Sequence, residues 1–180
     1  MTTNHCPQPK KRRKYNKPRT TFRVYTKAKS DYSLVVYNGK VILAPANPSD
    51  LLQHWIKEEN VGISVKDEEG HPSFALVNKA TGQAIKHSIG VTYPVQLKKY
   101  NPDKLDKSVL WTMGNNLDDG YRTVSAVDNT QLKLDAAFKD IKKHGGVNDD
   151  ADIVLCDWHG GNNQKWTIIS YSKFLSTNFT

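Results

Sequence analysis

Three segments of the sequence end in tryptophan at nearly equal intervals: "LLQHW" at residues 51–55, "SVLW" at residues 108–111 and "NNQKW" at residues 162–166. The intervals between the three tryptophans are 56 and 55 residues. A period of this length indicates an architecture built from a repeated unit, and it takes priority over any local structural signal.

Each tryptophan closes a segment with the same order of strand signals. An aromatic residue opens each segment, and turn residues such as Asn38-Gly39 and Thr81-Gly82 separate the apolar runs. The openers are Phe22, Phe74 and Tyr121, and the later runs are "KVILAP" from Lys40, "PVQLKKY" from Pro94 and "DIVLCDW" from Asp152. Helix signal is weak, because even "LDAAFKDIKKH" from Leu134 fits a strand that runs into a surface loop with one helical turn.

The repeat number decides between the all-β architectures. A propeller typically needs 4–8 blades, so three units are too few for one. Three four-stranded units that close into a barrel with a hairpin cap make a β-trefoil, which we predict as the fold. Trp55, Trp111 and Trp166 are then core residues, one in each repeat, since large aromatics at repeat-equivalent positions usually pack in the interior.

The basic charge of the chain is concentrated near its beginning. The net charge is +8, from 26 Lys and Arg against 18 Asp and Glu, and residues 1–19 hold seven basic side chains and no acidic one. This leaves 19 basic and 18 acidic residues for the rest of the chain. A nearly neutral body argues against nucleic-acid binding by the folded part, which would need a basic face.

The segment at residues 1–20 is predicted to be a disordered basic leader, because it has almost nothing to bury. Its run of Lys10, Lys11, Arg12, Arg13 and Lys14 has three interpretations: a nuclear localisation signal, a nucleic-acid-binding arm, or a solvated leader without function. No apolar stretch follows these charges or is long enough to cross a bilayer, so neither a secretory signal nor a membrane span is expected. Cys6 and Cys156 form no disulfide framework.

Longer stretches carry a family resemblance. The Q-x-W element occurs as "QHW" from Gln53 and "QKW" from Gln164, and is altered to "VLW" from Val109. Together with "ILAPANPSDLLQHW", "VKDEEGHPSFALVNKATGQAIKHSIG" and "PVQLKKYNPDKLDKSVLW", it resembles the Euonymus-lectin-like (EUL) domain of the ricin-B-like plant lectins. The resemblance covers residues 21–172, followed by a tail at 173–180. It implies a single β-trefoil, carbohydrate binding, a nuclear and cytoplasmic location in plant cells, and a role in stress responses.

One repeat carries the side chains that a sugar site needs. A neutral sugar requires a carboxylate that accepts from hydroxyls, an amide, and an aromatic ring for its C–H face. The residue that ends the second strand is Tyr37 in the first repeat, His87 in the second and Asp135 in the third. Only the third repeat combines this carboxylate with an amide, at Asn163. We therefore predict one glycan site there.

The predicted roles differ between the residues of this site. Asp135 is predicted to accept hydrogen bonds from sugar hydroxyls, Asn163 to act as a bidentate amide, and Trp158 to be a stacking platform. The structural alternatives are an ordinary turn carboxylate for Asp135 and barrel or rim packing for Trp158. Gln164 either contacts the sugar or braces the loop, and His144 of "HGGV" adds a contact. Relatives often carry an aromatic where this chain has Cys156, on the same strand face as Trp158. His159 stands where an amide is expected.

Other functional classes lack their signals. The sequence has no H-E-x-x-H, no G-x-S-x-G and no phosphate-binding glycine loop, and the acidic group at 149–152 lacks EF-hand spacing. We therefore expect no enzymatic activity, cofactor or metal site. The expected partners are glycans or glycoproteins, of mannose or galactose type and including N-glycans. One alternative is a protein- or nucleic-acid-interaction trefoil with a vestigial sugar site, in which nucleic acid would be bound through the leader. Another is a structural or stress-protective protein without a specific ligand.

Overall fold

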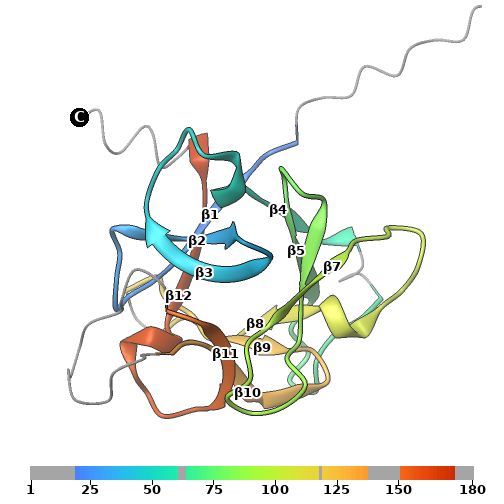
Figure 1. Ribbon diagram of the computed structural model, residues 1–180. Helices are drawn as coiled ribbons and strands as arrows, with labels where there is room; N and C mark the ends of the chain where they lie inside the picture. Colours follow the sequence, from blue (N-terminus) through green and yellow to red (C-terminus); the bar gives the residue numbers. More distant parts are fainter. Residues whose placement is uncertain (1–18, 61–63, 118, 138–150, 173–180) are drawn as a thin grey trace, which may run out of the picture.

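The computed structural model describes residues 19–60, 64–117, 119–137 and 151–172, and Figure 1 shows their arrangement. Short strands dominate, with three 3-10 turns, η1 (Leu51–Gln53), η3 (Lys107–Val109) and η4 (Asn162–Gln164), among the described residues. The strands are β1 (Phe22–Thr26), β2 (Tyr32–Tyr37), β3 (Lys40–Pro45), β4 (Trp55–Glu58), β5 (Ser73–Asn78), β6 (Gln83–Lys86), β7 (Gln96–Lys99), β8 (Trp111–Met113), β9 (Val124–Ala126), β10 (Asn129–Ala136), β11 (Ile153–Asp157) and β12 (Trp166–Ser170).

Six of the strands form a closed barrel. The neighbours run β9-β8-β5-β4-β1-β12, and the ring is completed where Arg122, just before β9, exchanges backbone hydrogen bonds of 2.9 and 2.8 Å with Trp166. The remaining strands pair as the hairpins β2–β3, β6–β7 and β10–β11, one in each repeat. Closure leaves the barrel without a free strand edge, which a half-open sheet would expose. The predicted β-trefoil is confirmed.

Each repeat contributes one tryptophan to the core between barrel and hairpins. Trp55, Trp111 and Trp166 are at most 1% exposed. Their indole N–H groups donate to matching hairpin carbonyls, those of Leu34 at 2.9 Å, Ile85 at 3.0 Å and Leu134 at 2.8 Å. A buried indole needs such an acceptor, so the core placement predicted from the repeat is confirmed.

These indole bonds also correct the comparison between repeats. Because Leu34, Ile85 and Leu134 are equivalent, the counterparts of Asp135 are Val35 and Lys86, and the predicted counterparts Tyr37 and His87 are wrong. The error arose from counting back from the hairpin turns, which differ in length between the repeats. His87 is instead partly buried at the edge of the core, where its ring packs on Trp111 at 4.6 Å and burial lowers the pKa of its imidazole.

The predicted opening residue of the third repeat is also displaced by one position. Phe22 and Phe74 lie opposite Trp55 and Trp111 in the barrel, and the residue opposite Trp166 is Arg122. Tyr121 is its neighbour and packs edge-on against Tyr25 at 6.1 Å. An aromatic residue one position away from the repeat-equivalent residue produced the mistaken alignment.

Candidate functional site

Asp135 lies on β10, directly opposite Val154 on β11, and two side chains from outside the hairpin converge on its carboxylate. Oδ1 accepts from Asn163 Nδ2 at 2.7 Å, and Oδ2 contacts His159 Nε2 at 2.8 Å. Asp135 is 3% exposed and Asn163 7%. The structure therefore brings the predicted carboxylate and amide into direct contact, held at the edge of the interior. Each carboxylate oxygen keeps further acceptor capacity, because it has two lone pairs.

His159 is the residue that the sequence analysis did not assign to the site. Its Nδ1 accepts from the Gly161 N–H at 3.3 Å, and its Nε2 reaches Asp135. A neutral ring with the proton on Nε2 satisfies both contacts. At the equivalent turns of the other repeats, Asn47 and Asn101 accept through Oδ1 from backbone N–H groups at 3.0 Å. Histidine preserves this turn and adds a second nitrogen that positions the carboxylate.

The turn before the third Q-x-W element differs in its cap. Asp50 caps η1 and Asp106 caps η3, because their side chains accept hydrogen bonds from the backbone N–H groups of Leu52 and Ser108 respectively. The equivalent residue at η4 is Gly161, which provides no side-chain cap. A Cβ at Gly161 would lie 2.3 Å from Asn163 Oδ1 and 2.6 Å from His159 Cε1. Glycine is needed here because the two site side chains occupy the space.

Gln164 has the bracing role, one of the two predicted for it. The residue is fully buried, its Oε1 accepts from the His159 N–H at 3.0 Å, and its Nε2 donates to the Asp157 carbonyl at 2.8 Å. Gln53 makes the matching bonds to Asn47 and Pro45 in the first repeat. Gln164 thus holds the loop that carries His159, and its amide is not open to a ligand.

Trp158 is exposed and lies directly after β11. It is 44% exposed, so Trp158 is not a buried residue of the core. Register and the Gln164 brace match it to Ala46 in the first repeat and Tyr100 in the second. An exposed indole beside a polar cluster is suited to stacking on the C–H face of a sugar.

Cys156, two residues before Trp158, lies opposite Lys133 on the hairpin. Burial raises the pKa of its thiol, and the negative charges of Asp135 and Asp157 act in the same direction. The thiol is therefore protonated at neutral pH. Its small side chain stands where the second repeat carries Lys98.

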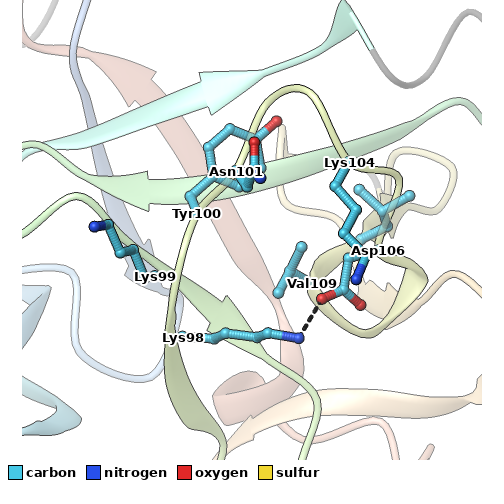
Figure 2. A pocket seen from close by; sticks show the side chains of 8 residues that line it. Lys98, Lys99, Tyr100, Asn101, Lys104, Asp106 and Val109 are labelled. Carbon is cyan, nitrogen blue, oxygen red and sulfur yellow. Dashed lines mark hydrogen bonds and ion pairs between the residues drawn. The ribbon is translucent and has the colours of Figure 1, made fainter.

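The second repeat carries a lysine where the third carries Asp135. Lys86 stands at the position of Asp135. Figure 2 shows the ion pair of Lys98 Nζ with Asp106, at 2.5 Å. A pocket of about 90 Å³ beside this pair is lined in part by Lys99, Tyr100 and Lys104. The first repeat has Val35 and Leu52 at the two positions that carry Asp135 and Asn163. The combination of carboxylate and amide is specific to the third repeat.

Several predicted residues lie outside the described residues: His144 and the leader cluster Lys10, Lys11, Arg12, Arg13 and Lys14. Within the described ranges, no cluster of three His, Cys, Asp or Glu side chains is arranged to hold a metal ion. No helix in the same ranges combines the length and apolar character that a bilayer crossing requires.

The closed barrel with one hairpin in each of three repeats defines the class of protein as a β-trefoil. Solved structures share the fold. The Macrolepiota procera ricin B-like lectin, in complex with lactose, superposes with a TM-score of 0.57 at 17% identity, over 83% of this chain and 94% of the lectin. The Rhizoctonia solani agglutinin gives 0.58 at 16% identity, over 86% and 97%.

Sequence relatives identify the family. The chain is 53% identical to ricin B-like lectin R40G3 of Oryza sativa subsp. japonica over 86% of its length and 75% of the relative. It is 56% identical to ricin B-like lectin EULS3 of Arabidopsis thaliana over 85% of this chain, but spans only 48% of that protein. The chain therefore belongs to the ricin B-like lectin family, and its EUL resemblance is confirmed. No protein-family model matches it.

Family membership also bears on catalysis. Lectins are carbohydrate-binding proteins without enzymatic activity, and the relatives are named as lectins. The expectation of a non-enzymatic protein agrees with these names.

Proposed function

We propose that the third repeat binds a glycan through Asp135, with Asn163 and His159 around it and Trp158 as the stacking ring. The observation that carries this proposal is the 2.7 Å contact between Asp135 and Asn163, side chains that are 28 positions apart in the chain. The other two repeats keep the same turn, and the first also keeps the glutamine brace, but neither has this pair. A retained scaffold with one distinct polar cluster supports a single site.

The cluster accounts for the kind of ligand that would bind. Asp135 accepts from hydroxyls, and the exposed His159 ring and Trp158 are the groups that an entering sugar meets. A sugar with the wrong hydroxyl orientation would leave these groups unpaired, which is a source of selectivity. We infer a ligand of mannose or galactose type on N-glycans or glycoproteins. A shallow site of this size gives a Kd of about 1 mM for one sugar, near −4 kcal/mol.

A glycan array with wild type, Asp135→Ala and the exposed control Asp103→Ala tests the site. We expect Asp135→Ala to lose glycan retention and Asp103→Ala to keep it. The first substitution also removes the acceptor of the buried Asn163 amide, which costs about 1–3 kcal/mol of stability. Its fold is therefore checked by circular dichroism. A folded Asp135→Ala protein that retains glycans as wild type does would refute the site.

The second candidate is an interaction trefoil with a vestigial sugar site, and the basic leader is the observation that favours it. Deletion of residues 1–19 separates the two functions. A lectin keeps glycan retention without the leader, whereas a nucleic-acid binder loses its affinity and its steep salt dependence. Retardation assays with a mixed-sequence duplex, at two salt concentrations, measure the second outcome.

We further propose that the protein resides in nucleus and cytoplasm, with residues 10–14 as the import signal, and that it acts in stress responses. The net basic charge of residues 1–19 supports this localisation. Fluorescent fusions of wild type and of a variant with five alanines at 10–14 test it. An unchanged nuclear fraction in the variant would assign import to another route.

A further inference from the structure

The β6–β7 hairpin ends in a longer loop than the fold requires. The β2–β3 hairpin turns through two residues, Asn38-Gly39, with φ values of 47° and 74°. This two-residue turn with positive φ matches strand twist and closes a hairpin by itself. In the second repeat Lys86 and Gln96 are the last paired residues, and the segment 87–95 lies between them. Its additional residues call for another explanation.

The loop is attached to the strand that leads to the candidate sugar site. Thr92 N–H donates to the Leu155 carbonyl and Val95 N–H to the Ile153 carbonyl, both at 2.8 Å. Pro94 forms an antiparallel bridge with Val154, which on its other side pairs with Asp135. In Figure 1 the green segment between β5 and β7 passes beside β11. Strand β11 therefore lies between this loop and the strand that carries Asp135.

The contacts of the loop lie along the strand that leads to Trp158 and His159. In an antiparallel arrangement, residues that precede Pro94 lie opposite residues that follow Val154. The Thr92–Leu155 hydrogen bond brings the loop alongside β11 three residues before Trp158, where the turn from Gly90 to Tyr93 lies. A ligand stacked on Trp158 would meet this loop if it extended across β11.

The loop presents apolar side chains to solvent. Ile89 is 75% exposed, Tyr93 55% and Val91 43%, and Trp158 at the end of β11 is 44% exposed. Exposed apolar residues that gather next to a polar cluster are typical of binding surfaces. Ile89, Val91 and Tyr93 share one loop, and that loop is hydrogen-bonded to β11, the strand that ends just before Trp158.

The conformation of the loop is held in place. Thr92 has a φ of 67°, which is unfavourable for a β-branched residue. Ser88 Oγ donates to the Gly90 carbonyl at 2.7 Å, and Tyr93 N–H donates to the same carbonyl at 3.3 Å. Backbone outliers that surrounding contacts maintain are concentrated at functional sites. A preordered loop also loses little entropy when a ligand binds.

We propose that residues 88–94, here named the extension loop, form a second subsite that contacts the saccharide units next to the one held by Asp135. The ligand class is then an oligosaccharide. This inference rests on the proposed function of the third repeat. Tyr93 and Ile89 would pack on the C–H faces of the adjoining sugars, in line with Trp158. Such contacts would raise the millimolar affinity expected for one sugar.

The test compares one sugar with three in NMR titrations. The probes are methyl mannoside with mannotriose, and methyl galactoside with a galactose-terminated trisaccharide. The variant is Ile89→Ser with Tyr93→Ala, and the control is Tyr37→Ala, a tyrosine 59% exposed on the first-repeat hairpin. We expect the double variant to bind the monosaccharide as wild type does and the trisaccharide about tenfold more weakly, a loss of about 1.4 kcal/mol. The control should match wild type for both.

Asp135→Ala separates the two proposals in the same titrations. The second subsite is supported if Asp135→Ala binds neither the monosaccharide nor the trisaccharide and the loop variant loses affinity for the trisaccharide alone. Equal mono- and trisaccharide affinity in wild type, or an unchanged affinity ratio in the loop variant, overturns it and leaves the primary site intact. A loop variant impaired only on intact glycoproteins overturns it in favour of a protein contact. Retention of the monosaccharide by Asp135→Ala refutes the proposed function itself.

Discussion

His159 distinguishes the third repeat from the other two at the scale of single residues. Asn47 and Asn101 make the same turn, but an asparagine side chain has no second nitrogen that could reach Asp135 as Nε2 does. The histidine therefore keeps the local backbone and adds a contact to the carboxylate. This is a positioning role, with part of the ring also open to a ligand.

His159→Asn tests that role. We expect the turn to survive, the melting temperature to stay within about 2 °C, and glycan affinity to fall about tenfold as Asp135 loses one of its two partners. Titration with the sugar found by the array, together with thermal denaturation, measures both. Wild-type affinity in the folded variant would show that the carboxylate needs no support from this ring.

Sequence reasoning found some of these residues and missed others for physical reasons. Asp135, Asn163 and Trp158 stand out because their types are unusual at repeat-equivalent positions. The contact between His159 and Asp135 joins residues 24 apart and depends on the loop path, which no local pattern encodes. Comparison with the asparagine turns in "ANP" from Ala46 and "YNP" from Tyr100 is the signal that would have revealed it.

Gly161 is decisive at the scale of the short elements, because the η4 turn gives up a cap to make room for the site. Its φ is −64°, an ordinary value for any residue, so only side-chain space excludes a Cβ. An Asn, Asp or Ser cap contributes typically ~1 kcal/mol to a helix end. The third repeat lacks the stability of such a cap, and the contacts of His159 and Asn163 with Asp135 occupy the space instead.

Gly161→Ala should displace Asn163 and His159 and abolish glycan binding, with the trefoil still folded. Gly160→Ala is the contrasting control, since its φ of 77° is strained for alanine but nothing lies within 4 Å of the added Cβ. The control should lose about 1–2 kcal/mol of stability and keep its ligand. Binding assays and chemical denaturation on both variants compare the two effects. Full binding by Gly161→Ala would contradict the packing described.

The Lys98–Asp106 pair in the second repeat predicts a pH effect. Hydrogen bonds from Lys98, first, and from Ser108 lower the pKa of Asp106 to about 2, against about 3.9 in an unfolded chain. A depressed carboxylate pKa stabilises the folded state above about pH 4, and this stabilisation is lost as the pH falls to about 2.

Thermal melts between pH 7 and pH 2 measure this effect. The difference in melting temperature between wild type and Asp106→Asn should be largest above pH 4 and shrink toward pH 2. Asp103→Asn, whose carboxylate is exposed, serves as the control and should show no such trend. If the difference in melting temperature between wild type and Asp106→Asn did not change with pH, the stabilisation by Asp106 would come from its cap of η3 and not from its charge.

Element lengths explain why the fold could be predicted but the repeat alignment was displaced. The tryptophans and apolar runs predict the number and order of strands, because each must reach the same core. Hairpin turns face solvent and vary freely, from Asn38-Gly39 to residues 87–95, so positions counted from a turn are misaligned. The three 3-10 turns were missed, since each depends on a cap or brace and not on apolar periodicity.

At the scale of the whole molecule, three buried tryptophans join the barrel to its hairpins. Trp166→Ala should destabilise the domain by about 3–5 kcal/mol, as for other buried aromatics. The matched variant Trp158→Ala removes the same side chain from an exposed position, so it should change stability by less than about 0.5 kcal/mol and weaken glycan binding. Denaturant titrations of both variants test this contrast, and a fully stable Trp166→Ala protein would contradict the core assignment.

The pairing of β1 with β12 has a consequence for longer polypeptides. Phe22 lies opposite Ser170, so the described chain enters and leaves its barrel at neighbouring points. Two domains of this kind can follow each other through a short linker without rearrangement of either ring of strands. Such a tandem protein would carry two copies of the proposed site, and its avidity for a branched ligand would depend on linker length as well as on the affinity of each site.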